Sequence, residues 1–298
     1  MVDRVPNLFL VGAMRSGTTA LHEALGAHVD IFMSSFKEPA YFADPVELAA
    51  DSPIISKAGY AGDRARYLEL FADAGSSRYA GESSTHYTKL PRITGIPERM
   101  AAMSPEARIV YLARDPVERT ISHYRFAVAR KYERRDCLAA LQAEPFYCAV
   151  GDYAEQIRPY IDEFGADRVH LCVLEDLIAD PRAELGELYA WLGVDPPANV
   201  PDLQRRNELA ASIQQARGPG FLHDIGRSAR YQRIAAGLVP AGARDRVRRW
   251  LNRSVAVDEV RTPAVLAYLR RVHRPQVAVL EHLFDRRFPG WTTVSTAD

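Results

Sequence analysis

Eight residues near the N-terminus place the strongest constraint on the fold of this 298-residue chain. Residues 12–19 read Gly-Ala-Met-Arg-Ser-Gly-Thr-Thr, and their two glycines have the G-x-x-x-x-G spacing of a phosphate-binding loop. The apolar run at 7–13 predicts a buried strand before the loop, and the pattern at 17–27 predicts a helix after it. Such a turn points backbone N–H groups and the positive end of a helix at an anion. The sequence therefore predicts an α/β fold with an anion site at the end of its first strand.

The loop differs from that of nucleoside-triphosphate enzymes at one position. Those enzymes follow the second glycine with a lysine that reaches the β and γ phosphates. This chain has Thr18 there and offers its cation earlier, at Arg15. We therefore expect the loop to bind an anion without supporting ATP hydrolysis. A glycine-containing turn with no ligand is the alternative interpretation, and the hydroxyls of Ser16, Thr18 and Thr19 argue against it.

Two further apolar strands, at 108–113 and 169–174, are each followed by a helical pattern. Asp115 is a suitable N-cap for the first of these helices, and Pro116 is a suitable first helical residue. Apolar strands that alternate with helices predict a three-layer α/β fold, in which helices flank a parallel sheet. Ligands of such sheets bind at the carboxyl ends of the strands, where the motifs of this chain fall.

The composition excludes several classes of protein. A chain of this length buries a core large enough to need neither a disulfide nor a structural metal. Its 38 basic and 38 acidic residues balance, so no global charge indicates nucleic acid as a partner. Three cysteines form no metal-type pair, and no metal site is predicted. The sparse cysteines and the lack of a long apolar run predict a cytoplasmic protein with no membrane span. No sequence feature indicates an oligomeric state.

The chain is predicted to form a single domain over 1–298. Residues 1–200 would form the α/β core with the binding motifs, and residues 201–298 an arginine-rich loop or lid region followed by a C-terminal helix. Eleven arginines fall between residues 205 and 253. This stretch either closes over the bound anion or forms a solvated helical face, and the sequence leaves both possibilities open.

Two motifs resemble the donor-binding elements of sulfotransferases that use 3'-phosphoadenylyl sulfate (PAPS). Arg15-Ser-Gly-Thr-Thr19 is similar to the 5'-phosphosulfate loop of that family. The second motif is a strand followed by Arg114 and, eight residues later, by Ser122. The resemblance spans roughly residues 7–195 and implies the P-loop NTPase-like sulfotransferase fold.

Two more motifs look like segments of the branch that acts on heparan sulfate. They are Lys37-Glu-Pro-Ala-Tyr-Phe42 and Glu82-Ser-Ser-Thr-His-Tyr87, and all four motifs follow the order of the family. The C-terminal stretch at 283–291, which ends Phe-Pro-Gly-Trp, is similar to the end of many bacterial members.

The resemblance implies which residues bind PAPS. The loop would hold the 5'-phosphosulfate, Arg114 and Ser122 would hold the 3'-phosphate, and a basic loop would approach the 3'-phosphate from the arginine-rich stretch. The implied donor-binding residues are Arg15, Ser16, Gly17, Thr18, Thr19, Arg114, Ser122, Arg227 and Ser228.

An acceptor hydroxyl also needs a base. The heparan-sulfate branch implies Glu38 for this role, with Lys37 beside it. His86 is the rival base, because the cytosolic small-molecule branch of the superfamily uses a histidine. The candidate catalytic residues are therefore Glu38, Lys37, Arg15 and His86.

The predicted reaction is in-line transfer of a sulfuryl group from PAPS, without a metal, to a hydroxyl or amine of a saccharide, lipid or small-molecule acceptor. One alternative is a P-loop nucleotide kinase or another phosphotransferase, which would require magnesium and ATP. The other is a non-catalytic nucleotide-binding protein, which would have no need of Glu38. The sequence does not identify the acceptor.

Overall fold

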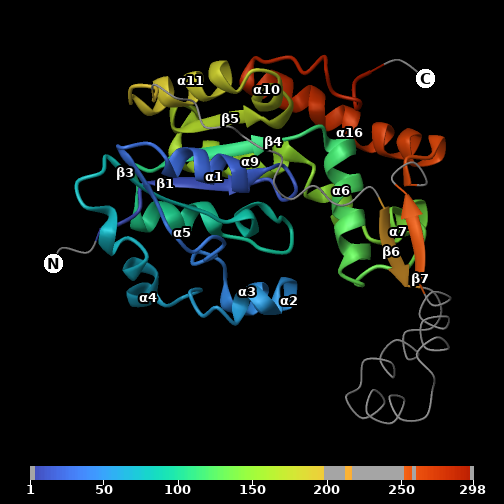
Figure 1. Ribbon diagram of the computed structural model, residues 1–298, viewed down its shortest axis with the longest axis horizontal. Coiled ribbons are helices and arrows are strands. Elements are labelled where there is room, and N and C mark those ends of the chain that lie inside the picture. Colours follow the sequence, from blue (N-terminus) through green and yellow to red (C-terminus); the bar gives the residue numbers. More distant parts are fainter. Residues whose placement is uncertain (1–3, 198–211, 217–251, 257–259, 296–298) are drawn as a thin grey trace, which may run out of the picture. The chain divides into compact units, whose positions relative to one another are not determined.

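The computed structural model describes residues 4–197, 212–216, 252–256 and 260–295 (Figure 1). The chain divides into two compact units. The first unit comprises Met1–Thr120, Phe146–Asn207 and Leu269–Asp298, and the second comprises Ile121–Pro145 and Glu208–Tyr268. The organisation as a single domain, with a lid in its C-terminal third, stays a prediction.

The first unit is built on a five-stranded sheet in which every neighbouring pair of strands is parallel. The strand order is β2-β3-β1-β4-β5. This confirms the predicted parallel sheet. The strands are β1 (Leu8–Gly12), β2 (Ile31–Met33), β3 (Tyr79–Ser83), β4 (Arg108–Ala113) and β5 (Val169–Val173).

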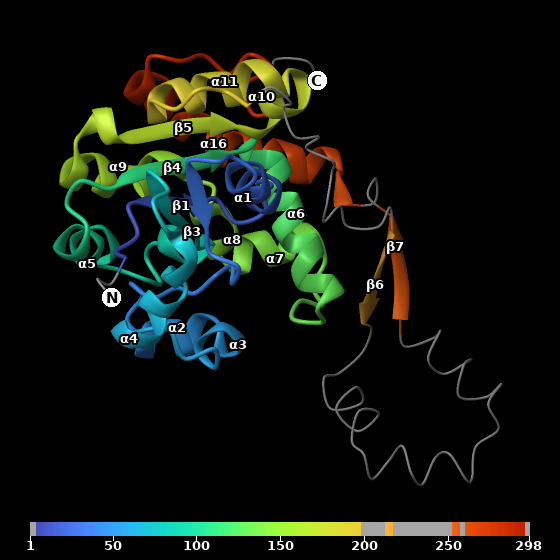
Figure 2. The ribbon, with the colours of Figure 1, turned by 60° about the vertical axis from the view of Figure 1, so that its left-hand side comes forward.

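Alternate residues of β1 pack on opposite faces of this sheet. Leu8 and Leu10 belong to a core that includes buried residues of α1 (Thr18–Gly26), α10 (Leu174–Ala179) and α11 (Pro181–Leu192). Phe9 and Val11 belong to a second core, formed with α5 (Ile96–Met103), α9 (Tyr153–Phe164) and the last part of α16 (Pro263–Phe284). Helices therefore cover both faces, as Figure 2 shows for α1 and α9, and the predicted three-layer architecture is confirmed.

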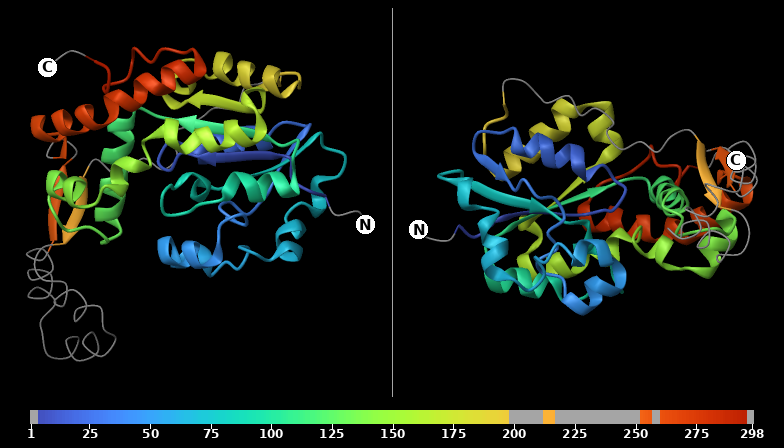
Figure 3. Two further views of the ribbon diagram at one scale, coloured as in Figure 1. Left: turned by 180° about the vertical axis from the view of Figure 1, so that it is seen from behind. Right: turned by 60° about the horizontal axis from the view of Figure 1, so that its bottom comes forward.

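Short elements complete the first unit. They are α2 (Pro45–Asp51), α3 (Pro53–Ser56), α4 (Arg64–Glu69), η1 (Ala72–Ala74), η2 (Thr85–Thr88), α8 (Phe146–Ala149) and η3 (Ala166–Arg168). Further views of the ribbon show α2, α3 and α4 connecting β2 to β3 (Figure 3).

The second unit contains most of α6 (Pro116–Ala129), which begins in the first unit, and α7 (Cys137–Ala143). It also contains an antiparallel pair of strands, β6 (Ser212–Ala216) and β7 (Asn252–Ala256). Most of the arginine-rich stretch lies outside the described residues.

The elements predicted from the sequence are observed with small changes at their ends. The predicted strands correspond to β1, β4 and β5, and Asp115 caps α6 by accepting a hydrogen bond of 3.0 Å from the Val117 N–H. The helix expected after β5 is observed as two helices, α10 and α11. Among the described residues, no helix is both long and apolar enough to cross a lipid bilayer.

Candidate active site

The loops that follow β1, β2, β3 and β4 all lie at the carboxyl-terminal end of the sheet, because these parallel strands end on the same side. Backbone hydrogen bonds connect them. The Ser84 N–H donates to the Leu10 carbonyl at 3.1 Å, and the Glu38 N–H donates to the Ser83 carbonyl at 2.8 Å. The fold thus brings together motifs that are far apart in the sequence.

The two glycines of the phosphate loop are required for different reasons. A side chain at Gly12 would place its Cβ 2.2 Å from Thr88 Oγ1, whose hydroxyl donates to the Val11 carbonyl at 2.9 Å. Gly17 has a φ of 91°, in the left-handed region that glycine adopts without strain. Arg15 also has a positive φ, of 70°. The loop therefore has the compact backbone that close approach of an anion requires.

The inside of the loop offers unused donors. Ser16 is fully buried, and its Oγ lies near the Tyr153 hydroxyl but makes no hydrogen bond of ordinary geometry in the described part of the chain. The N–H groups of Thr18 and Thr19 belong to the first turn of α1, where no helical carbonyl can accept from them. These groups fit an oxyanion, which would satisfy them together.

Lys37 supplies a cation to the phosphate loop from the loop after β2. Its Nζ donates to Thr18 Oγ1 at 3.2 Å and to Glu38 Oε1 at 3.1 Å. Thr18 occupies the sequence position where nucleoside-triphosphate enzymes carry their lysine. The structure therefore provides a lysine at this point of the loop from a different segment of the chain.

Glu38 is held in place by four groups. Its Oε2 accepts hydrogen bonds from the Thr85 N–H at 2.8 Å and from Nδ1 of His86 at 3.1 Å, while its Oε1 accepts from Lys37. The Thr85 hydroxyl lies 3.2 Å from both oxygens. Burial raises the pKa of Glu38, but the His86 hydrogen bond and the Lys37 charge outweigh it and lower the pKa to about 2. Its side chain remains 19% exposed, so an acceptor can reach it.

His86 lies between two carboxylates. Its Nδ1 contacts Glu38, and its Nε2 lies 3.9 Å from Oδ2 of Asp51, at the end of α2. Asp51 in turn pairs with Lys89 at 2.6 Å and with Arg92 at 3.4 Å. Burial raises the pKa of Asp51, but Lys89 reverses this and lowers it. A chain of polar side chains thus connects Lys37 to Lys89 through Glu38, His86 and Asp51.

Glu82, the first residue of the motif at 82–87, is a fully buried carboxyl group for which the sequence predicted no role. Its oxygens accept hydrogen bonds from the hydroxyls of Tyr67 (3.1 Å), Tyr87 (2.5 Å) and Ser84 (2.8 Å). No lysine or arginine in the described residues pairs with it. Burial raises the pKa of Glu82 to about 7, although the three hydroxyls oppose that shift.

Arg114 leaves the end of β4 and reaches the phosphate loop. Its guanidinium donates to the Arg15 carbonyl at 3.4 Å, and its own carbonyl accepts from the Tyr153 hydroxyl at 2.6 Å. Asp115, next to it, is buried and accepts hydrogen bonds from Thr292 and Thr293 near the C-terminus. Asp115 is thus engaged with residues near the C-terminus, and the structure shows no ion pair between it and Arg114.

The structure describes all but two of the predicted site residues. Arg15, Ser16, Gly17, Thr18 and Thr19 form the phosphate loop. Lys37, Glu38 and His86 lie beside it, and Arg114 contacts it through the Arg15 carbonyl. Ser122 lies on α6 in the second unit, so its pairing with Arg114 stays a prediction. Arg227 and Ser228 lie outside the described residues. Within the residues that are described, no group of His, Cys, Asp and Glu side chains is arranged to hold a metal ion.

Two proteins of known identity are similar to this chain in sequence. Bifunctional heparan sulfate N-deacetylase/N-sulfotransferase 2 of Homo sapiens is 23% identical over 243 residues, which are 76% of this chain and 26% of that protein. Heparan sulfate glucosamine 3-O-sulfotransferase 3B1 of Mus musculus is 23% identical over 200 residues, covering 64% of this chain and 47% of that protein. This chain therefore spans less than half the length of either relative.

A solved structure agrees over almost the whole chain. The crystal structure of a sulfotransferase from Alicyclobacillus acidocaldarius has a TM-score of 0.67 and 25% identity, and the alignment covers 97% of this chain and 99% of that one. The sequence model described as "Sulfotransferase family" matches residues 6–197, which include the phosphate loop, Lys37, Glu38, His86 and Arg114. A strand-to-helix anion loop and a match over most of the chain lead to one assignment: the chain belongs to the sulfotransferase family.

Proposed function

We propose that this protein transfers a sulfuryl group from PAPS to a hydroxyl or amine group of an acceptor, without a metal ion. The observation that carries the proposal is the contact of Lys37 Nζ with Thr18 Oγ1. It gives the loop a cation beside its N–H groups, so the charge on a transferring sulfuryl group can be neutralised by side chains and backbone alone.

The described residues fit the two charged ends of PAPS. The phosphate loop, with the buried Ser16 and the first turn of α1, suits the 5'-phosphosulfate. The Arg114 guanidinium, placed beside the loop, suits the 3'-phosphate, since its planar fork can grip a phosphate through two bonds. Ser122 would complete this second site, and Arg227 and Ser228 would approach it from the arginine-rich stretch. PAPS would supply the activated sulfuryl group, and these residues would orient it.

Glu38 is the proposed proton acceptor. Sulfuryl transfer resembles phosphoryl transfer, in which positioning and electrostatics supply most of the catalysis. A carboxylate with a pKa near 2 is a weak base for a free hydroxyl. It becomes an adequate one once the acceptor oxygen bonds to sulfur, because that oxygen then loses its proton readily. Glu38 would thus take the proton late in the transfer.

His86 is the competing base, and its surroundings favour a positioning role. Both ring nitrogens lie near carboxylates, of Glu38 and Asp51. A histidine in this arrangement orients the Glu38 carboxylate through Nδ1, while its Nε2 lies beside Asp51.

The class of acceptor follows from the family only in general terms. The named relatives act on heparan sulfate, a saccharide, and for this protein a saccharide, a lipid or a small molecule fits the proposal. Location in the cytoplasm, as the sequence predicted, is part of the same proposal.

Incubation with PAPS and a panel of acceptors tests the proposal. In the presence of a metal chelator we expect release of adenosine 3',5'-bisphosphate together with a sulfated acceptor, identified by mass spectrometry. Consumption of ATP that requires magnesium, with no consumption of PAPS, would instead identify a nucleotide kinase.

A further inference from the structure

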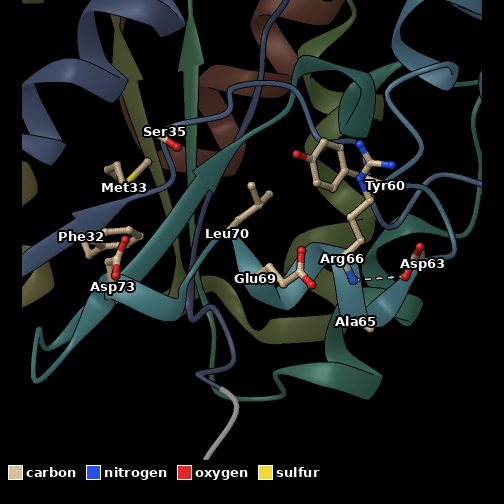
Figure 4. Close-up of a pocket in the computed structure, with 10 residues that line it drawn as sticks. All are labelled: Phe32, Met33, Ser35, Tyr60, Asp63, Ala65, Arg66, Glu69, Leu70 and Asp73. Carbon is tan, nitrogen blue, oxygen red and sulfur yellow. Dashed lines mark hydrogen bonds between the residues drawn. The ribbon is translucent and has the colours of Figure 1, made fainter. Parts of the chain in front are cut away.

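The hollow beside the edge strand β2 contains none of the proposed catalytic residues (Figure 4). Its ten described lining residues include neither Lys37, Glu38 nor His86, and its carboxylates are exposed. Buried polar side chains instead surround the turn from β4 to α6, which carries Arg114. Several of them belong to the C-terminal segment, residues 285–295, to which the proposed function assigns no role.

The C-terminal segment is fixed to the helices and strands of the first unit. Arg286 donates to the Leu171 carbonyl on β5 at 3.2 Å and pairs with Glu184 of α11 at 3.0 Å. Trp291 is 1% exposed, and its ring stacks on that of Phe288 at 4.2 Å between ring centres. The segment therefore has a defined position at the carboxyl ends of β4 and β5.

Trp291 contacts two side chains that hold the backbone of Arg114 and Asp115. Its ring packs edge-on against Tyr153 at 6.2 Å between ring centres, and its Nε1 donates to Oε2 of Glu175 at 3.1 Å. The Tyr153 hydroxyl donates to the Arg114 carbonyl at 2.6 Å and accepts from the Arg114 N–H at 3.4 Å. Oε1 of Glu175 accepts from the Asp115 N–H at 3.0 Å. Trp291 thus supports the hydrogen bonds that fix the backbone at Arg114.

Thr292 and Thr293 engage a carboxylate that could otherwise pair with Arg114. Oδ1 of the buried Asp115 accepts from the Val117 N–H at 3.0 Å and from the Thr293 hydroxyl at 2.6 Å, and its Oδ2 accepts from the Thr292 N–H. With both oxygens occupied, this carboxylate forms no ion pair with Arg114 in the described part of the chain. The guanidinium therefore stays available to an anion beside the phosphate loop.

We propose that the C-terminal segment is a positioning element of the donor site and sets its preference for nucleotides with a 3'-phosphate. The inference rests on the proposed function, which assigns that phosphate to Arg114. Trp291 holds the backbone at Arg114 through Tyr153 and Glu175. Thr293 keeps the neighbouring carboxylate away from the guanidinium. Both act through Arg114 and are positioning residues.

Two nucleotides that differ only in the 3'-phosphate test the proposal by calorimetry. They are adenosine 3',5'-bisphosphate and adenosine 5'-monophosphate, and the full-length wild type should bind the bisphosphate at least about tenfold more tightly. Thr293→Val removes the hydroxyl at nearly constant volume. It should weaken bisphosphate binding by about tenfold, as when one hydrogen bond to a charged group is lost, and leave monophosphate binding unchanged. Thr293→Ser keeps the hydroxyl and should keep the preference.

Trp291→Phe tests the second contact. It removes the N–H that donates to Glu175 but keeps an aromatic ring, and it should reduce the preference in the same way. The matched control is Trp191→Phe, since the Trp191 indole donates to the Asp167 carbonyl at 2.9 Å, just before β5 and at the opposite end of the sheet. This control should keep the preference. If Trp291→Phe does not fold, the two threonine variants decide the question alone.

The outcomes separate the inference from the proposed function. A preference that survives in Thr293→Val, a preference that is lost in Thr293→Ser, or an equal loss of affinity for both nucleotides would overturn the role of the segment, and the sulfotransferase proposal would stand. If the wild type binds the bisphosphate no more tightly than the monophosphate, the 3'-phosphate site and the proposed function both fail.

Discussion

Nζ of Lys37 lies 3.2 Å from Oγ1 of Thr18, so a lysine that follows β2 contacts the first residue of the helix that follows β1. The phosphate loops of nucleoside-triphosphate enzymes carry their lysine within the loop itself. Here the cation comes from a second loop that also carries Glu38. One short segment thus connects the proposed donor site with the proposed proton acceptor.

Replacing Lys37 should therefore impair turnover strongly. In Lys37→Met the apolar stem is retained and the charge is lost, and we expect kcat to fall by about 10²-fold, as when one donor to a developing charge is removed. The control is Lys57→Met, at an exposed position after α3, which should leave kcat unchanged. Turnover near that of the wild type in Lys37→Met would contradict the role of this lysine.

Replacing Glu38 should slow the chemical step and leave donor binding unchanged. Glu38→Gln should keep the affinity for adenosine 3',5'-bisphosphate and reduce kcat by about 10²-fold or more, as expected for a lost general base. Because the pKa of Glu38 is lowered to about 2, the wild-type kcat should show no loss of activity as the pH falls from 7 to 5. Retained turnover in Glu38→Gln, or an acid limb in that range, would favour a histidine base.

The buried Glu82 should make stability depend on pH in an unusual direction. Burial raises its pKa in the folded protein to about 7, from the 4.5 of an ordinary glutamic acid, so between these pH values the folded state holds a proton that the unfolded state has lost. The contribution of Glu82 to the free energy of unfolding is fully present below about pH 4.5. It is lost as the pH rises through 7, which lowers the free energy of unfolding by about 3 kcal/mol in total.

Denaturant unfolding from pH 5 to 8 measures this effect. Glu82→Gln should show a weaker decline of the free energy of unfolding than the wild type does. Glu163→Gln, at an exposed position of α9, should follow the wild type. Parallel curves for all three proteins would show that Glu82 titrates normally.

Gly12→Ala should destabilise the protein through one contact. The added Cβ would lie 2.2 Å from Thr88 Oγ1, which forces the loop or η2 to move, and overpacking of this kind costs about 1–3 kcal/mol. Combination with Thr88→Ala should recover part of this loss, so a double-mutant cycle by thermal unfolding measures the contact. Gly186→Ala, inside α11 with no atom within 4 Å of the new Cβ, should instead stabilise the protein slightly. Additive effects of Gly12→Ala and Thr88→Ala would contradict the explanation.

The parts of the fold that the sequence predicted are those with strong local patterns. β4 has a continuous run of five buried residues after Arg108, and Asp115 with Pro116 marks the start of α6. β2 has only three residues, and β3 contains Gly81, Glu82 and Ser83, so neither shows the pattern of a buried strand. Their positions depend on pairing with β1, which no local pattern encodes.

The sequence predicted which residues form the site, but it did not predict the hydrogen bonds that hold them. The phosphate loop, Lys37, Glu38 and His86 come from motifs, and the structure brings them together. The burial of Glu82 depends on Tyr67, which is 15 residues away in the sequence, and the anchoring of Asp115 depends on Thr293, which is 178 residues away. Contacts of this separation are set by the sheet topology.

Binding of adenosine 3',5'-bisphosphate, compared by calorimetry with binding of ADP and ATP, with and without magnesium, tests the central claim most directly. We predict that the bisphosphate binds at least about tenfold more tightly than ADP, through the charge-assisted bonds of Arg114, that magnesium has no effect, and that Arg114→Ala removes the preference. Tighter binding of ATP that requires magnesium would contradict a PAPS site and identify the loop as that of a nucleotide kinase.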